Sequence, residues 1–240
     1  MLQKIKEIFF KYFNRPKKQQ NKPAYKTAIE YAVLIIVFLA LRSSVFGNYR
    51  IPTGSMIPTL KIGDHLFANK LAYSLKVPFT KNHIIRWAHP KRGEVVSFKY
   101  PVDERYDYTK RVIGIPGDRL SLKDKRLTIN GKVLPLTFVG IDDGYKLYEE
   151  DLLGTKHLIR VAPFSTEYDS FDEIEIPKGM YFCMGDNRDN SSDSRFWGFV
   201  PLENFDGRLG FRWIHIETNG TILNFLPKIT KVSLAGFGIL

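Results

Sequence analysis

The sequence predicts a mostly β fold in which one apolar helix precedes a region built from strands. Outside a single long apolar run, the chain has no heptad pattern, internal repeat or long helical period. Several short segments instead combine aromatic and β-branched residues and end at turn signals such as Pro116-Gly117 and Asn130-Gly131. With 240 residues, of which 44% are hydrophobic and 14% aromatic, the chain can form one or two domains with a real core.

The chain begins with a basic arm, residues 1–26. The arm has eight lysines and arginines and one acidic residue, Glu7, so it carries +7 of the total charge of +11 and leaves +4 for the rest. This uneven distribution argues against a nucleic-acid-binding face and favours a cytoplasmic arm beside a membrane. Residues 1–13 fit either a short amphipathic helix on an anionic membrane surface or a frayed basic tail, and residues 14–22 fit a linker.

The next segment, residues 27–46, is a candidate transmembrane anchor. Residues 31–41 are uninterrupted apolar residues, and the flanks extend the run to twenty residues, or about 30 Å of helix, which matches a bilayer core. Glu30 and Arg42 stand near the ends, where charged side chains reach the interface. Because the basic arm precedes the run, the positive-inside rule places the N-terminus in the cytoplasm and everything after Arg42 outside. A cleaved signal peptide or a buried core helix are the alternatives, and the first lacks a good small-x-small cleavage site.

After the anchor, the pattern predicts a β core with a smaller β region inserted into it. The expected core strands lie in residues 47–119 and 177–215, and the insert covers residues 120–176, which contain no evident catalytic cluster. The basic and apolar stretch 79–90 fits a loop that dips into a membrane interface or one that packs ordinarily. The apolar neighbours of Cys183, the single cysteine, predict a buried thiol and no internal disulfide. The tail, residues 216–240, has no clear pattern.

Ser55 is the candidate nucleophile. It lies in Ile51–Leu60, where Pro52 and Pro58 stiffen the backbone and the small residues Thr53-Gly54-Ser55 can leave a hydroxyl and a backbone N–H exposed. Apolar residues of the same stretch could line a pocket. Taken alone, Gly-Ser between prolines is more typical of an ordinary loop.

A serine nucleophile needs a base, and Lys110 is the candidate. The five histidines stand in ordinary contexts, none beside an acid in a dense motif. A lysine amine normally titrates near ~10.4, but burial among apolar groups lowers its pKa and allows it to act as a base. By strand alternation Lys110 shares a face with Tyr108 and Val112, while Asp107 points to the other face. A solvated strand lysine is the alternative interpretation.

The loop Gly185–Gly198 is the third informative segment. Its Asp, Asn and Gly residues supply turn conformations and local hydrogen bonds. Asp193 and Arg195 could pair and fix the loop, and Ser191 could offer a hydroxyl that orients a neutral lysine amine. A solvated loop and a metal-binding loop are the alternatives, and Arg188 and Arg195 argue against the second because they would repel a cation.

Taken together, the chain resembles the bacterial type I signal peptidases, or leader peptidases. The resemblance rests on four segments that follow in order, with the anchor in front, and the insert and the tail match only loosely. These segments are Ile51–Leu60 with Gly63-Asp64, Arg92–Phe98, Lys110–Asp118 and Gly185–Pro201.

The resemblance implies a membrane-anchored, all-β catalytic domain that contains a Ser/Lys dyad, with Ser55 as nucleophile and Lys110 as general base. It implies an oxyanion hole made of the Ser55 N–H and the Thr53 hydroxyl, a lysine-orienting role for Ser191, and a structural pair of Asp193 and Arg195. It also implies shallow apolar pockets for small substrate residues. The residues expected to contribute to these pockets are Tyr49, Ile51, Met56, Leu60 and Tyr108.

The function that the resemblance implies is removal of N-terminal signal peptides from exported preproteins after Ala-x-Ala-like sites. The expected partners are signal-peptide-bearing preproteins and membrane lipid, with no nucleic acid, cofactor or metal. The expected location is the bacterial inner membrane, with the catalytic domain outside. Two other hypotheses are a soluble, self-cleaving Ser/Lys repressor-type protease and a non-enzymatic, membrane-anchored β module that binds anionic lipid. The bilayer-length run and the lack of a helix-turn-helix pattern argue against the first.

Overall fold

The computed structural model of the chain describes residues 23–80, 82–222 and 226–239. The chain divides into two compact units, with the boundary between Leu39 and Ala40. The alternatives for residues 1–13, the linker and most of the basic arm lie outside the described residues.

The apolar run forms one helix, α2 (Ala24–Val45), of 22 residues. Its side chains are almost all exposed, in keeping with a helix whose apolar groups surround it on every side. Within the described part of the chain, α2 is the one helix that is long and apolar enough to cross a membrane by length and composition. It begins three residues before the predicted segment 27–46 and ends one residue before its end.

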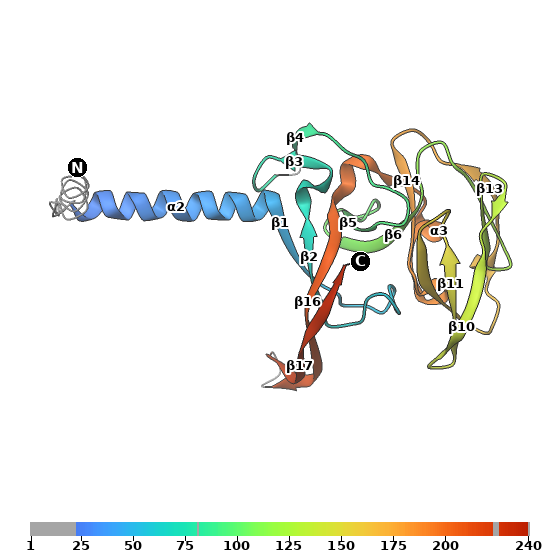
Figure 1. Ribbon diagram of the computed structural model, residues 1–240. Helices are drawn as coiled ribbons and strands as arrows, with labels where there is room; N and C mark the ends of the chain where they lie inside the picture. Colours follow the sequence, from blue (N-terminus) through green and yellow to red (C-terminus); the bar gives the residue numbers. More distant parts are fainter. Residues whose placement is uncertain (1–22, 81, 223–225, 240) are drawn as a thin grey trace, which may run out of the picture. The chain divides into compact units, whose positions relative to one another are not determined.

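The rest of the described chain is built from strands, which run through the sequence in order (Figure 1). The described residues also contain four short turns of 3-10 helix: Lys70–Ala72, Glu167–Asp169, Arg188–Asn190 and Leu202–Asn204. A short helix, α3 (Ser194–Trp197), lies near the C-terminal strands. The strands are β1 (Phe46–Arg50), β2 (Asp64–Asn69), β3 (Ser74–Lys76), β4 (His83–Arg86), β5 (Val95–Lys99), β6 (Asp107–Gly114), β7 (Arg119–Lys123), β8 (Arg126–Ile129), β9 (Lys132–Val133), β10 (Leu136–Asp142), β11 (Tyr145–Asp151), β12 (Lys156–Val161), β13 (Phe171–Glu175), β14 (Met180–Met184), β15 (Val200–Pro201), β16 (Phe205–Ile222) and β17 (Leu226–Ile239).

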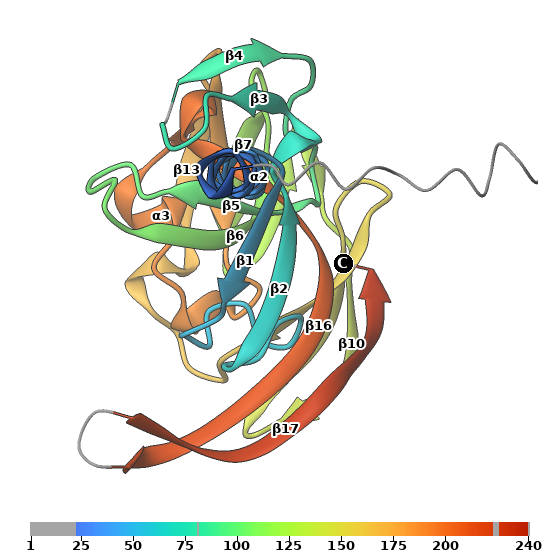
Figure 2. The same cartoon turned by 90° about the vertical axis from the view of Figure 1, so that its left-hand side faces the viewer.

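The main sheet has the strand order β1-β2-β16-β5-β6-β14-β15, and β17 pairs with β16. Its strand pairs are antiparallel, and the long strands β16 and β17 form a bent ribbon (Figure 2). Strand β6 lies between β5 and β14, with Val96 opposite Lys110 and Val95 opposite Arg111. Lys110 therefore projects from the middle of the sheet rather than from an edge.

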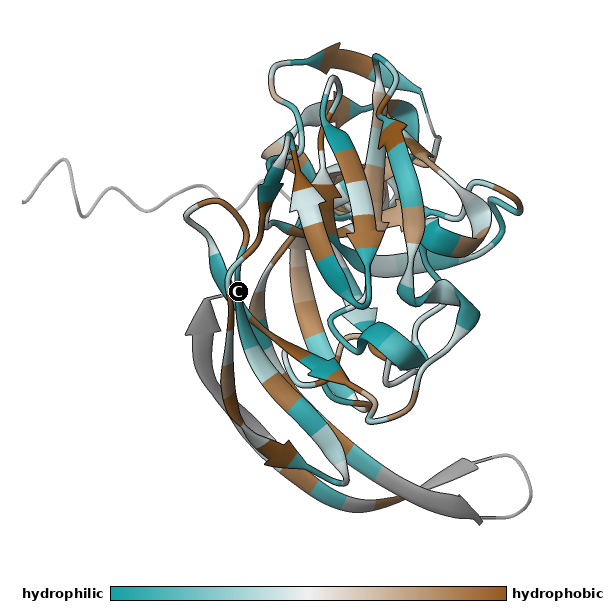
Figure 3. Cartoon of the chain, turned by 90° about the vertical axis from the view of Figure 1, so that its right-hand side faces the viewer, coloured by the Kyte–Doolittle hydropathy of each residue, from teal (hydrophilic) through white to brown (hydrophobic). Residues whose placement is uncertain are grey.

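Apolar and polar bands follow each other along the strands in Figure 3, and apolar clusters pack against the main sheet. One apolar cluster joins Val96, Phe98 and Val112 to Cys183, which is fully buried as the sequence predicts. The other joins Ile51, Met56 and Leu60 of the Ser55 loop to Val95 on β5. The Ser55 loop is thereby packed onto the sheet that carries Lys110.

Strands β7 to β13 form two smaller sheets beside the main one. The first has the order β13-β7-β8-β9, and the second has the order β10-β11-β12. At the predicted Asn130-Gly131 turn between β8 and β9, both residues have positive φ, as a tight hairpin requires. A third apolar cluster, with Leu120, Leu127 and Ile129, fills the space between these strands and Phe182 of β14.

Strand β2 ends at Asn69, where the chain leaves the sheet and turns through Lys70–Ala72. The tail, which had no clear sequence pattern, forms the end of β16 and all of β17. Hairpin pairing satisfies its backbone, and such pairing leaves only a weak signal in sequence. The predicted mostly β fold class, with one apolar helix in front, is confirmed.

Gly63 offers a test of how the Ser55 loop is attached to the sheet. Its φ is +91°, its N–H donates to the Ile51 carbonyl at 2.9 Å, and its carbonyl accepts from the Ile216 N–H at 2.9 Å. A Cβ there would lie 2.2 Å from the Ile216 carbonyl oxygen. We expect Gly63→Ala to lower the free energy of unfolding by at least ~3 kcal/mol, measured by urea unfolding in detergent.

The matched control is Gly117→Ala, because Gly117 has φ +87° but no atom within 4 Å of a built Cβ. It should cost only the backbone term of about 1 kcal/mol. Equal losses in the two variants would contradict the close approach of the Ser55 loop to β16.

Candidate active site

The structure brings Ser55 and Lys110 together. Lys110 Nζ lies 2.7 Å from Ser55 Oγ, although 55 residues separate them in sequence. Lys110 is 4% exposed and sits over the Tyr108 ring, with its nitrogen 5.7 Å from the ring centroid. The described hydrogen-bond partners of the Ser55 hydroxyl are Lys110 and Thr53. The serine therefore has a basic nitrogen, and no histidine, at bonding distance.

Burial lowers the pKa of the Lys110 amine to about 8. Loss of water disfavours the charged form and is the largest cause, while Asp193 and Asp186 oppose it and Arg195 reinforces it. Near neutral pH a useful fraction of the amine is thus uncharged. An uncharged amine in contact with a hydroxyl can accept its proton.

Thr53 and the Ser55 loop border an open cavity. Thr53 Oγ1 lies 3.5 Å from Ser55 Oγ. The cavity has a volume of about 580 Å³, and Ser55, Lys110 and Thr53 line it together with residues of β1, β6 and the loop after β14. A peptide can therefore reach the serine hydroxyl from solvent, whereas the lysine amine behind it is covered.

Four of the five expected pocket residues line this cavity: Tyr49, Ile51, Met56 and Tyr108. The fifth, Leu60, does not line it, because it is fully buried and packs beneath the loop with Met56. The cavity is also less apolar than expected, since Asp107 and Thr109 line it too. The Tyr49 hydroxyl donates to Asp206 at 3.3 Å, and Asp206 pairs with Lys76 at 2.5 Å, so Tyr49 is held from outside the cavity.

Asp193 and Arg195 form a pair in the loop after β14. The Arg195 guanidinium donates to both carboxylate oxygens of Asp193, at 2.9 Å each. Asp193 also accepts from the Gly185 N–H at 3.0 Å and begins α3 by accepting from the Arg195 N–H. Because Arg195 further donates to the Arg188 carbonyl, the pair closes the loop on itself.

Ser191, expected to orient the Lys110 amine, is not bonded to that amine in the structure. Its side chain is buried, but Oγ has no hydrogen-bond partner within the described residues, so the structure gives no bond between Ser191 and Lys110. The hydroxyl lies against Gly185, where a Cβ would come within 2.2 Å of Ser191 Oγ and 2.4 Å of the Ser55 carbonyl oxygen. Glycine at 185 is thus what allows the loop to approach Ser55 so closely.

Asn187, which the sequence did not single out, fastens this loop to the Ser55 loop. Its side-chain amide donates to the Gly54 carbonyl at 2.9 Å, and its backbone N–H donates to the Ser55 carbonyl at 3.1 Å. Two bonds therefore fix the backbone on which Ser55 stands. Its place in the Asx-rich loop that follows β14 was the available signal in the sequence.

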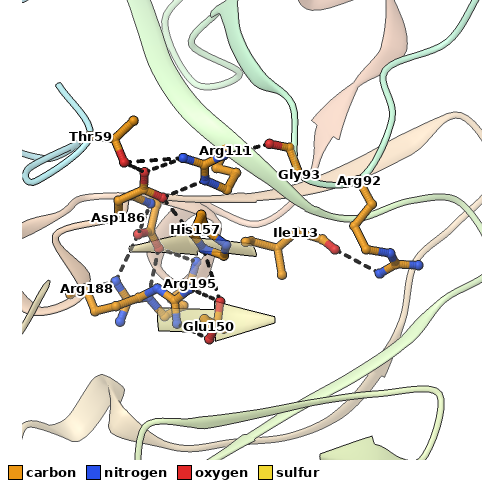
Figure 4. A network of polar contacts seen from close by, with 12 residues as sticks. Thr59, Arg92, Gly93, Arg111, Ile113, Glu150, His157, Asp186, Arg188 and Arg195 are labelled. Carbon is orange, nitrogen blue, oxygen red and sulfur yellow. Dashed lines mark hydrogen bonds and ion pairs between the residues drawn. The ribbon is translucent and has the colours of Figure 1, made fainter. Parts of the chain in front are cut away.

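Next to Lys110 on β6, Arg111 binds Asp186 through two hydrogen bonds of 2.8 and 2.7 Å (Figure 4). The same guanidinium donates to the Gly93 carbonyl at 2.7 Å. Thr59, from the Ser55 loop, donates to Asp186 at 2.5 Å. The buried Arg111 charge lowers the pKa of the Asp186 carboxyl despite its burial, so the carboxylate stays ionised. This group ties β6, the Ser55 loop and the loop after β14 to one point.

The network continues into the insert. Arg188 donates to both carboxylate oxygens of Glu150 on β11, one of these bonds measuring 2.8 Å. His157 on β12 lies between Glu150 and Asp186, with Nε2 3.3 Å from the first carboxylate and 3.9 Å from the second. Glu150 is fully buried, and Arg188 and His157 hold the pKa of its carboxyl down at about 2. Sequence reasoning did not identify this cluster, because Glu150 and His157 lie in a segment without a motif.

The chain is similar in sequence to known proteins. Residues 25–214 match the family described as "Signal peptidase, peptidase S26". A signal peptidase I of Pseudomonas aeruginosa is 40% identical over 219 residues, covering 85% of this chain and 76% of the relative. A signal peptidase I of Rickettsia akari is 34% identical over 249 residues, covering 91% of this chain and 93% of the relative. A crystal structure of a signal peptidase I from Enterococcus faecalis is 28% identical, with a TM-score of 0.35, and covers 51% of this chain and 97% of that one.

The family match and the two relatives define the chain as a peptidase. The chain belongs to the signal peptidase family, peptidase S26, and is a serine endopeptidase.

The low pKa of Lys110 makes stability depend on pH. The unfolded chain keeps this amine protonated up to its ordinary pKa of 10.5, whereas the folded chain releases the proton above about 8. The unfolded state then binds more protons, so the free energy of unfolding should rise between these pH values, by about 3 kcal/mol in all. Urea unfolding at several pH values measures it.

The comparison is with Lys110→Met, which keeps the apolar stem and removes the charge. The difference in unfolding free energy, wild type minus variant, should increase across this range, because other groups titrate alike in both proteins. Parallel curves for the two proteins would contradict a lowered lysine pKa.

Proposed function

We propose that this protein removes N-terminal signal peptides from exported preproteins by cutting after Ala-x-Ala-like sequences, with Ser55 as nucleophile and Lys110 as general base. One observation carries the assignment of residues: the buried amine of Lys110 lies 2.7 Å from the Ser55 hydroxyl. Membership of the signal peptidase family supports the choice of substrate.

The reaction begins when neutral Lys110 accepts the Ser55 proton while Oγ attacks the scissile carbonyl. The oxyanion that forms receives hydrogen bonds from the Ser55 N–H and the Thr53 hydroxyl, and one such donor is typically worth ~3–4 kcal/mol. Protonated Lys110 then gives its proton to the leaving amine, so the peptide bond breaks and an acyl-enzyme remains. Water, deprotonated by Lys110, hydrolyses the ester and returns Ser55 to its first state.

The surrounding polar groups hold the Ser55 hydroxyl and the Lys110 amine next to each other. Asn187 fixes the backbone at Gly54 and Ser55, and the Arg111–Asp186 pair holds β6 beside it. Asp193 and Arg195 keep the loop after β14 closed. Ser191 stays the proposed orienting hydroxyl for Lys110, a role that needs a rotation of its side chain toward the amine.

The substrate lies extended in the cavity between β1 and β6, where Tyr49, Ile51, Met56 and Tyr108 leave room for small residues before the cut. The α2 helix is a single-pass anchor in the bacterial inner membrane. The N-terminus lies in the cytoplasm and the catalytic domain lies outside, because the basic arm precedes the helix. Ser55 comes ten residues after Val45, the last residue of α2, so cleavage takes place near the outer membrane surface.

Removal of either reacting group should abolish cleavage. With Ser55→Ala or Lys110→Met, we expect kcat/KM for a purified preprotein to fall by ~10³-fold or more, because the nucleophile or its base is lost. Gel analysis of the product and sequencing of its new N-terminus measure both the rate and the site of cleavage. A Lys61→Met variant, which changes an exposed lysine on the same loop, is the matched control. Near wild-type activity in Lys110→Met would remove the Ser/Lys dyad from the mechanism.

The pH dependence should follow Lys110. Since only the neutral amine accepts the Ser55 proton, kcat/KM should rise about tenfold per pH unit below pH 8 and level off above it. The measurement uses substrate well below KM over the range in which the protein stays folded. A profile that is flat through pH 8 would exclude a base of this pKa.

A further inference from the structure

The β3–β4 hairpin carries an exposed apolar surface whose residues do not line the catalytic cavity. Its side chains are strongly exposed: Phe79 by 71%, Ile84 by 59%, Ile85 by 57% and Trp87 by 52%. With Val77 they form what we call the hairpin patch. Strand β4, at the top of Figure 3, shows as a brown band.

The geometry of this hairpin leaves an apolar side chain exposed on each of its faces. Strands β3 and β4 pair only with each other, as a two-stranded sheet, so Ile84 and Ile85 project to opposite sides and are both exposed. An isolated two-stranded ribbon is barely stable in water. A medium that covers both faces, such as a lipid layer into which the ribbon dips, removes more apolar area from water than docking on one face would.

The hairpin is tied to the end of the anchor helix. The Phe79 N–H donates to Ser43 Oγ at 3.0 Å, and Lys70 Nζ donates to the Ser43 carbonyl at 3.1 Å. Ser43 lies two residues before Val45, where α2 ends. With α2 across the bilayer, the tip of the hairpin is fixed at the level where the chain leaves the membrane.

The charge of the segment suits an anionic lipid surface. Residues 74–91 contain four lysines and arginines and no acidic residue. Lys76 is paired with Asp206, while Arg86 on β4 has no acidic partner within the described residues. Trp87, whose indole N–H donates to the Leu71 carbonyl at 3.1 Å, is the residue type enriched at membrane interfaces.

We propose that the β3–β4 hairpin inserts the hairpin patch into the outer interfacial layer of the anionic bilayer beside α2. This attachment, added to the anchor, fixes the height of the Ser55 cavity above the membrane. The proposal rests on the membrane anchoring proposed above.

The test places an environment-sensitive fluorophore on single introduced cysteines in the full-length protein. The native Cys183 does not interfere, because it is fully buried and burial raises the pKa of its thiol. The labelled positions are Ile84→Cys and Ile85→Cys, and the matched control is Ile141→Cys, an exposed isoleucine on β10. The protein is reconstituted in vesicles of phosphatidylethanolamine and phosphatidylglycerol at ~3:1, with and without bromine on the acyl chains.

We expect brominated lipid to reduce fluorescence at positions 84 and 85 at least twofold and to leave position 141 unchanged. A label at Leu34→Cys in α2 separates the two proposals. If position 34 is quenched and position 84 behaves like 141, the hairpin proposal is overturned while the anchor stands. If position 34 is not quenched either, the anchoring is overturned and the hairpin proposal falls with it.

A second measurement follows the consequence for cleavage. The double variant Ile84→Ser/Ile85→Ser should lower the ratio of kcat/KM for a membrane-inserted preprotein to kcat/KM for a short soluble peptide by about tenfold. The control, Phe138→Ser/Ile141→Ser, changes exposed apolar residues of the insert and should leave this ratio unchanged. Equal ratios in the two variants would contradict a role of the hairpin in positioning the site.

Discussion

The contact between a buried amine and a serine hydroxyl is the interaction on which the rest of this structure depends. Lys110 stays reactive only if no carboxylate holds it protonated, yet Asp193 and Asp186 both lie near enough to raise its pKa. Each of these acids forms an ion pair with an arginine: Asp193 with Arg195, and Asp186 with Arg111. The arginines thus have an electrostatic task besides holding the loop, since they neutralise the acids that would otherwise keep the lysine charged.

The geometry of the pair comes from segments far apart in the chain. Lys110 lies on β6, an inner strand of the main sheet. Ser55 lies on a loop whose backbone is held by bonds from outside that sheet. The loop after β14 joins them, because Asn187 binds the backbone at Ser55 while Asp186 binds the neighbour of Lys110. A small shift of this loop would change the distance between base and nucleophile without touching either residue.

The sequence predicts the parts of this site that depend on local chemistry. Ser55, Lys110 and the Asp193–Arg195 pair stand in dense motifs, and the mostly β fold follows from short β-branched segments between turn signals. The sequence does not predict contacts that depend on how distant elements pack. Glu150 and His157 meet Arg188 only through the pairing of β11 and β12, and Leu60 turns under the loop instead of into the cavity. The end of β16 and all of β17 were not predicted, because hairpin pairing rather than a regular apolar period stabilises them.

The cluster of Glu150, His157 and Arg188 has a consequence for how this enzyme can vary. The strands of the insert look like a separable module, but they supply Glu150, the carboxylate that forms the buried ion pair with Arg188. A chimera that received another enzyme's β11–β12 segment would bury the Arg188 guanidinium without its ion-pair partner unless an acid arrived with the segment. The insert and the loop after β14 must therefore be exchanged, or diverge, as one unit.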